Sequence, residues 1–170
     1  MKSFLLLSAV AGCGKSTWST MYAMRHRNVF IVSSDEVRRE VAGGYQVFDK
    51  EKEVWEEFFR RINEYAKLDY DELTVIADAT NLKNAYRMRA LESVHGFDRK
   101  VLVLLRKPLD VILKQNQMRP KEKIVPEQVV RNMFNSFEEP SEEVLKGFDE
   151  YCVYYQTFDY DKFKSTFKDK

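Results

Sequence analysis

A short segment near the amino terminus, residues 9–17 with the sequence AVAGCGKST, places the strongest constraint on the fold. It follows an apolar run at residues 4–7 and precedes a stretch that can form a helix, which is the context of a phosphate-binding loop. Glycines at positions 12 and 14 let the backbone turn tightly, so that successive N–H groups can face a phosphate. The segment therefore predicts that a strand, a loop and a helix together hold a nucleotide.

Single side chains of this loop have predicted roles. Lys15 can bridge the β- and γ-phosphates of ATP, and Ser16 can ligate Mg²⁺. Ala9 stands where the usual pattern has glycine, which requires a negative φ at this position. The alternative is an ordinary strand-to-helix turn with a solvated lysine. The remaining residues predicted to contact ATP here are Ala11, Gly12, Cys13, Gly14 and Thr17.

Short apolar runs alternate with longer amphipathic stretches along the chain, which is typical of β–α units. The sequence thus predicts a three-layer α/β/α sandwich with a central, mainly parallel five-stranded sheet. We expect strands at 3–7, 29–32, 73–77, 101–105 and 151–155. We expect helices from about residue 34 to the glycines at 43 and 44, and over 51–68, 84–94, 109–118 and 126–137. The aromatic stripe of the helix at 51–68 is interpreted as core.

Composition limits the number of domains and the partners. A chain of 170 residues, 44% of them hydrophobic, predicts one domain, placed at residues 1–157 with a tail over 158–170. Lys and Arg number 28 against 27 Asp and Glu, so no overall basic field draws the protein to nucleic acid. Two cysteines, one inside the phosphate loop, favour a reducing, cytoplasmic setting. No apolar run reaches the length of a membrane span, and the oligomeric state stays open.

Asp35 follows the second predicted strand and is the first candidate for catalysis. At the carboxyl end of a parallel strand its carboxylate would face the terminal phosphate and could take a proton from an attacking hydroxyl. Arg38 lies one helical turn later on the same face, where it could hold an acceptor phosphate or pair with Asp35. The alternative for Asp35, or for Ser34, is a side chain that merely caps the following helix.

Asp78 ends the third predicted strand and opens the sequence DATNL. An aspartate at this place beside a phosphate loop commonly holds Mg²⁺, through water or directly, or orients the loop serine. Thr80 and Asn81 are candidate contacts for the acceptor, although a turn that needs hydroxyl and amide caps explains them nearly as well.

Later arginines complete the candidate site. Arg119 stands where a helix passes into a basic segment, and it could neutralise the transferring phosphoryl group. The alternative is a solvated helix C-terminus, where cations are favoured in any case. Arg131 on the following helix could flank the nucleobase of ATP. Arg87 and Arg89 are interpreted as surface charges.

Five motifs follow one another along the chain in a characteristic order: AGCGKSTW, SSDEVR, DATNL, QNQMRP and IVPEQVVRNM. Together they resemble the kinase domain of the polynucleotide 5′-hydroxyl kinases of phage and bacterial nucleic-acid repair. The resemblance runs over about residues 2–155 and implies that Asp35 is the general base. It further implies that Arg38 holds the 3′-phosphate of the acceptor nucleotide and that Arg119 belongs to a lid over the ATP phosphates.

Three departures from the family pattern leave the acceptor open. Ala9 replaces a loop glycine, Gln115 stands where the lid has a further arginine, and no DxDxT segment follows. We expect ATP-dependent, Mg²⁺-assisted transfer to the 5′-hydroxyl of DNA or RNA. The alternatives are a kinase of a small metabolite, nucleoside or modified base, and a nucleotide-dependent switch or binding module.

Overall fold

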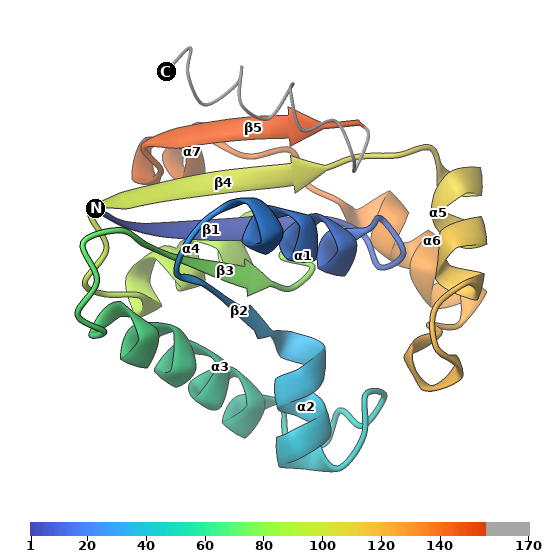
Figure 1. Ribbon diagram of the computed structural model, residues 1–170. Coiled ribbons are helices and arrows are strands. Elements are labelled where there is room, and N and C mark those ends of the chain that lie inside the picture. Colours follow the sequence, from blue (N-terminus) through green and yellow to red (C-terminus); the bar gives the residue numbers. More distant parts are fainter. Residues whose placement is uncertain (156–170) are drawn as a thin grey trace.

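Five strands form one sheet in the computed structural model, which describes residues 1–155 (Figure 1). Within that range the strand order is β2-β3-β1-β4-β5, and every neighbouring pair is parallel. The predicted strands are confirmed, and the sheet they form is entirely parallel rather than mainly so. The strands are β1 (Lys2–Ser8), β2 (Val29–Ser33), β3 (Leu73–Asp78), β4 (Arg99–Leu105) and β5 (Glu150–Tyr154).

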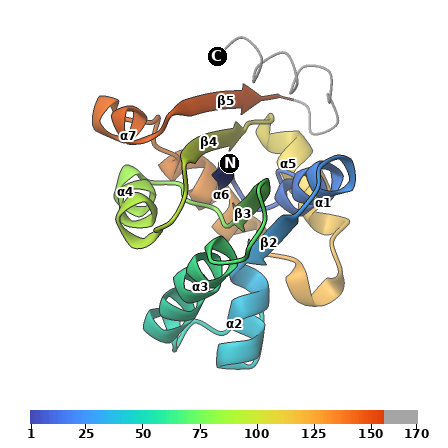
Figure 2. The same cartoon turned by 60° about the vertical axis from the view of Figure 1, so that its left-hand side comes forward.

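Helices cover both faces of the sheet, as the three-layer prediction requires (Figure 2). Side chains of α1, α5 and α6 pack on one face, and those of α2, α3, α4 and α7 pack on the other. The helices are α1 (Lys15–Arg25), α2 (Ser34–Ala42), α3 (Glu51–Ala66), α4 (Asn84–Ser93), α5 (Leu109–Gln117), α6 (Glu127–Ser136) and α7 (Glu142–Gly147), with one 3₁₀ turn, η1 (Lys121–Lys123).

Alternation along the central strand divides the core into two layers. Leu5 and Leu7 of β1 belong to the layer under α1 and α5, whereas Phe4 and Leu6 belong to the layer under α3 and α4. All four side chains are fully buried. A strand that is buried on both faces reads as a continuous apolar run, which is why residues 4–7 carry no polar residue.

The strand register brings the candidate site together. Leu6 of β1 pairs with Ala77 of β3, and Ser33 of β2 pairs with Asp78 of β3. Because parallel strands end at the same edge of a sheet, the loop after β1, the start of α2 and Asp78 lie side by side. This edge is where ligands bind in open α/β sheets.

The structure adds one helix and corrects one sequence expectation. The short helix α7 (Glu142–Gly147) was not predicted, because six residues give too few turns for a hydrophobic period to show. The stripe on α3 is only partly core: Val54, Phe58 and Ile62 are buried, whereas Trp55 and Phe59 are partly exposed. The predicted tail over 158–170 and the domain boundary at 157 lie outside the described residues.

Within residues 1–155, no helix combines the length and the apolar character that crossing a bilayer would require.

Candidate active site

The backbone of the loop between β1 and α1 has the curvature that the sequence predicts. Gly12 has φ 89° and Gly14 has φ 95°, a region that other residues rarely adopt. A Cβ atom on Gly12 would lie 2.7 Å from the carbonyl oxygen of Ile112, so α5 also excludes a side chain here. In the described part of the chain the only other residues with positive φ besides glycines are Asn28 and Asn81. Ala9 therefore meets the condition placed on it.

Lys15, Ser16 and Asp78 meet at the floor of this loop. Ser16 Oγ donates a hydrogen bond to Asp78 Oδ2 at 3.0 Å. Burial lowers the pKa of the Lys15 ammonium group, while the carboxylates of Asp78 and Asp35 act in the opposite direction. Burial likewise raises the pKa of Asp78, against the pull of Lys15 and Ser16. The Lys15 ammonium group and the Asp78 carboxylate are thus poorly solvated. Together they can bind an anion and the cation that accompanies it.

The donor set at this floor fits Mg²⁺. A serine hydroxyl and a buried carboxylate are hard oxygen ligands, and Mg²⁺ binds in phosphate sites through one or two such groups plus phosphate oxygens. Asp78 is 5% exposed and its carboxylate accepts a hydrogen bond from the Ser16 hydroxyl, so a cation bound here would compensate for the solvation that the carboxylate loses on burial. Ser16 and Asp78 are therefore the residues that can hold the metal.

Asp35 does not cap α2, which was the alternative role for its side chain. The N-cap of α2 is Ser33, whose side chain accepts a hydrogen bond from the backbone N–H of Glu36. The side chain of Asp35 is 40% exposed, so a ligand can reach it. Its two oxygens face two arginines: Oδ1 lies 3.3 Å from Arg38 Nη1, and Oδ2 lies 3.2 Å from Arg119 Nη2. The expected grouping of Asp35, Arg38 and Arg119 is thus present.

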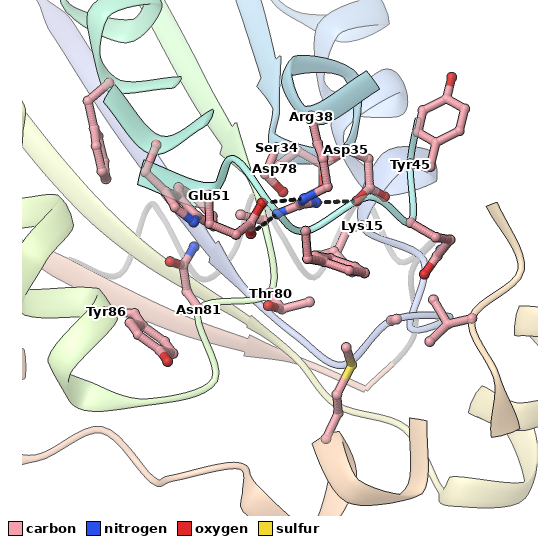
Figure 3. Close-up of a pocket in the computed structure, with 18 of the residues that line it drawn as sticks. Lys15, Ser34, Asp35, Arg38, Tyr45, Glu51, Asp78, Thr80, Asn81 and Tyr86 are labelled. Carbon is pink, nitrogen blue, oxygen red and sulfur yellow. Dashed lines mark hydrogen bonds and ion pairs between the residues drawn. The ribbon is translucent and has the colours of Figure 1, made fainter. Parts of the chain in front are cut away.

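Arg38 is held by a partner that the sequence did not reveal. Its Nε and Nη2 donate to the two carboxylate oxygens of Glu51 at 2.9 and 2.7 Å, while Nη1 reaches Asp35 (Figure 3). The residue is only 6% exposed. Glu51 opens α3, thirteen residues further along the chain, and nothing in the local sequence marks it as a partner. Arg38 is therefore a neutralised arginine beside Asp35.

The segment between α5 and α6 folds over α2. Arg119 follows the end of α5 and reaches Asp35, while Lys123 in η1 lies 3.0 Å from Glu36. The hydroxyl of Tyr45 donates to Glu36 at 2.8 Å, and the Lys123 ammonium group lies 5.0 Å from the Tyr45 ring centre. We refer to residues 118–124 as the lid. Two ion pairs connect this lid to α2.

Asn81 and Arg87 form a buried polar cluster behind the site. Asn81 has φ 43° and its amide donates to the carbonyl of Leu7 at 2.9 Å. Arg87 is fully buried, and the interpretation as a surface charge is wrong for it. Its nitrogens donate to the Asn81 carbonyl at 3.1 Å and to Ser8 Oγ at 2.9 Å, and burial lowers its pKa to about 10. These bonds join α4 to the end of β1.

Other predicted site residues divide between the site and its surroundings. Cys13 is buried and its thiol donates to the carbonyl of Leu105 at 3.2 Å, so its side chain faces the core. Burial raises the pKa of this thiol. Thr17 is exposed at the start of α1. Arg131 lies on an exposed part of α6, where its Nε is 3.4 Å from Glu127 Oε2. It does not line the cavity beside the phosphate loop.

A cavity of about 1380 Å³ opens beside the loop. Figure 3 shows Lys15, Asp35 and Arg38 grouped around one part of it, with Tyr86 apart from them. The cavity thus extends from the phosphate loop along α3 and α4. Near the loop it is lined by Ala11, Lys15, Ser34, Asp35, Arg38, Asp78, Thr80, Asn81 and Arg119, and further away by Phe48, Glu51, Trp55, Phe59, Tyr86 and Arg89, among others.

Sequence reasoning missed much of the far wall. Trp55 and Phe59 were interpreted as core and Arg89 as surface, yet all three line the cavity. An amphipathic pattern identifies the face of a helix that is buried, but a cavity wall and a packed core produce the same pattern.

Comparison with known proteins agrees with this geometry. A family model described as AAA domain matches residues 5–140. Kti12 of Chaetomium thermophilum with ADP-AlF3 is 11% identical, with a TM-score of 0.70 over 98% of this chain and 96% of that one. A sugar kinase from Janibacter sp. is 18% identical, with a TM-score of 0.69 over 99% and 95%.

A third similar structure is the Pnkp1/Rnl/Hen1 RNA repair complex. The likeness has a TM-score of 0.70 at 18% identity, over 87% of this chain and 46% of that one. Comparison with the curated proteins finds no match. The match to the family model spans well over half of the chain, and the structural likenesses show the fold. The chain therefore belongs to the AAA domain family, and its fold is that of the P-loop kinases.

Proposed function

We propose that this protein is a kinase that transfers the γ-phosphoryl group of ATP to a hydroxyl group, most simply the 5′-hydroxyl at the end of a DNA or RNA strand. One observation carries the proposal. The partly exposed carboxylate of Asp35 lines the same cavity as Lys15, and helix capping does not use it. A nucleotide-dependent switch needs no such acid beside the terminal phosphate, whereas transfer to an alcohol uses one as the general base.

The residues of the site divide the chemistry among them. The acceptor oxygen bonds to the γ-phosphorus, the bond from that phosphorus to the β–γ bridging oxygen breaks, and the acceptor proton passes to Asp35. Lys15 and Arg119 carry the positive charges that balance the phosphoryl oxygens during transfer. Ser16 and Asp78 would hold Mg²⁺, which supplies further charge neutralisation at the phosphates. Arg38 orients Asp35, and Thr80 and Asn81 border the space for the acceptor.

The shape of the cavity supports a polymeric acceptor. The part of this cavity next to Lys15 and Asp78 is where the phosphates of ATP would lie, and the cavity continues beyond Asp35 along α3 and α4. Its far wall presents Phe48, Trp55 and Tyr86, all partly or fully exposed. Aromatic rings beside cations are the usual surface for single-stranded nucleic acid, because bases stack on rings whatever their sequence.

A kinase of a small metabolite is the second candidate. The formal net charge of +1 favours it, because strands of nucleic acid are usually met by a basic surface. The same cavity would then accept a polar small molecule near Asp35 and leave its aromatic end to solvent.

Transfer of labelled γ-phosphate decides between these acceptors. The purified protein is given ATP, Mg²⁺ and one of three acceptors: a 5′-hydroxyl oligonucleotide, a free nucleoside, or a panel of sugars. We expect the oligonucleotide to be labelled with the lowest KM, and its binding to weaken log-linearly with salt because phosphate contacts release counterions. Labelling of nucleosides or sugars alone would overturn the polynucleotide assignment and leave the kinase assignment in place.

A further inference from the structure

We propose that Arg89, rather than Arg38, receives a backbone phosphate of the acceptor strand, so that Arg89, Trp55 and Tyr86 form an acceptor subsite at the far end of the cavity. This inference rests on the proposed polynucleotide acceptor and goes beyond it, because it assigns a cation that the motifs do not mark. The ligand chemistry is a phosphodiester anion next to a nucleobase.

Arg38 already has its hydrogen-bonding groups occupied by Glu51 and Asp35. Two of its nitrogens bind both oxygens of Glu51 at 2.9 and 2.7 Å, and the third lies 3.3 Å from Asp35. A guanidinium group with two carboxylates has little net attraction for a further anion. At 6% exposure it also has little surface with which to contact one. Arg38 is thus a positioning residue for the Asp35 carboxylate.

Arg89, in contrast, is surrounded by aromatic rings. Its guanidinium carbon lies 4.5 Å from the ring centre of Trp55, 5.1 Å from that of Tyr86 and 5.7 Å from that of Phe59. Its Nε is buried without a hydrogen-bond partner, and in the described part of the chain no carboxylate forms an ion pair with it. Arg89 lines the cavity together with these three rings.

The three aromatic rings explain how the charged guanidinium group of Arg89 is held in place. Cation–π contacts hold the guanidinium plane in place at a modest gain, yet they neutralise none of its charge. Burial lowers the pKa of Arg89 and the nearby Glu51 carboxylate acts in the opposite direction, but an arginine stays protonated in proteins, and this guanidinium group has no carboxylate at ion-pair distance among the described residues. A phosphate oxygen pair matches the planar fork of donors, which makes arginine the common residue for this recognition.

The rings also provide a place for the base beside that phosphate. Tyr86 is 44% exposed and Trp55 is partly exposed, so each has a ring surface open to the cavity. A phosphodiester and the base next to it lie within a few ångströms of each other. A cation and aromatic rings on one wall therefore fit a nucleotide unit better than an isolated inorganic anion.

Oligonucleotides with single neutral linkages test this subsite. The probe is a 5′-hydroxyl tetranucleotide in which the first, second or third phosphodiester is replaced by a methylphosphonate. For the wild-type protein we expect one of these replacements to raise KM by roughly 10- to 100-fold with kcat nearly unchanged, as for loss of a charge-assisted hydrogen bond. The Arg89→Met variant should show a similar rise with the unmodified strand and no further rise with that methylphosphonate.

Three companion variants separate the subsite from other roles. Arg89→Lys keeps the charge without the planar fork, so it should recover part of the sensitivity to the neutral linkage. Arg38→Met should lower kcat but leave that sensitivity intact. Arg27→Met, an exposed arginine between α1 and β2 at the opposite edge of the sheet, should behave like the wild type. Thermal melting of each variant shows whether it is folded.

The outcomes are distinguishable. An equal effect of the neutral linkage in the wild type and in Arg89→Met, or loss of that effect in Arg38→Met instead, would overturn the Arg89 subsite while the kinase acts on oligonucleotides. Equal losses for charged and neutral strands in Arg89→Met would give Arg89 a structural role only. If the wild type labels no oligonucleotide at all, the proposed acceptor fails, and the subsite fails with it.

Discussion

The two ends of the cavity are built in different ways. The end next to Lys15, which we propose takes the nucleotide, is built from one short backbone segment between β1 and α1, with Lys15 and Ser16 following directly. The other end, which we propose takes the acceptor, is built from side chains of α2, α3, α4 and the lid, which are far apart in sequence. The nucleotide end therefore depends on backbone conformation, and the acceptor end depends on tertiary packing.

This difference explains what each end can recognise. Backbone N–H groups of a tight loop bind any triphosphate in one geometry, because their positions are set by φ and ψ. Side chains on separate helices can be exchanged one at a time, which changes the acceptor without changing the donor. A change at one end should thus leave binding at the other end intact.

The largest effect is expected at the junction of the two ends. Asp35→Asn removes the group that accepts the proton, so we expect kcat to fall by roughly 10²- to 10⁴-fold while ATP affinity stays unchanged. Phosphate transfer and fluorescent nucleotide binding measure the two quantities. Glu40→Gln, on the same helix and paired with Arg61, is the matched control and should retain full activity. Unchanged turnover in Asp35→Asn would instead favour the switch.

The next effect concerns the nucleotide end alone. Gly12→Ala places a side chain at φ 89° and 2.7 Å from the carbonyl oxygen of Ile112. We expect ATP affinity to drop at least tenfold and the free energy of unfolding to drop by about 1–3 kcal/mol. Gly43→Ala is the control, since Gly43 has φ 94° but no atom near the added Cβ. The Gly43→Ala variant should have a lower free energy of unfolding and an unchanged affinity for ATP. Calorimetry measures both quantities.

At the acceptor end, Glu51→Gln tests the support of Asp35. The amide oxygen of the new side chain could still accept a hydrogen bond from Arg38. The buried guanidinium group of Arg38 would, however, lose the negative charge that balances it. We expect a decrease of about 1–3 kcal/mol in the free energy of unfolding and a decrease of about tenfold in kcat, with ATP affinity retained. Glu53→Gln, in the same first turn of α3 and exposed, is the control. A loss of ATP affinity in Glu51→Gln would contradict the separation of the two ends.

The smallest effect belongs to the lid. Lys123→Met removes its ion pair with Glu36, and partly exposed pairs contribute about 0–1 kcal/mol. Hydrogen exchange over residues 118–124 should rise slightly, whereas exposed Lys121→Met should change nothing.

The same lid contact has a pH window. Burial opposes both charges, but Tyr45, Lys123 and Arg39 lower the pKa of Glu36, and Glu36 raises that of Lys123. The contact is therefore present at neutral pH. It is lost as pH falls through the Glu36 pKa, below its usual 4.5, or rises through the Lys123 pKa, above its usual 10.5. Faster exchange of the lid within that window would contradict this assignment.

The nucleotide end and the strands could be predicted from the sequence because their signals are local. The loop motif spans nine consecutive residues, and strands buried on both faces appear as apolar runs. Asp78 could be found in the same way, since it ends such a run, and the register then places it beside Ser33. The position after β2 identifies Asp35, whereas the capping alternative is excluded only by the structure, in which Ser33 caps α2.

The rest depends on contacts between distant residues. Nothing near Arg87 indicates that it reaches Ser8, 79 positions away, and so its burial was missed. Glu51 opens a helix with several other acids, and only the packing of α3 against α2 selects it as the partner of Arg38. Trp55 has the spacing of a core residue, yet the fold leaves part of its ring open to the cavity.

The path of the chain between β2 and β3 has a consequence for how such a protein can change. Helices α2 and α3, with the loop that joins them, form one uninterrupted excursion that leaves the sheet at residue 33 and returns at residue 73. That excursion carries Asp35, Arg38, Glu51 and Trp55, whereas the phosphate loop follows β1 and Asp78 ends β3. Swapping this single insert between homologues would exchange most of the wall that we propose faces the alcohol in one step, without moving the strand pairing that positions the phosphate loop.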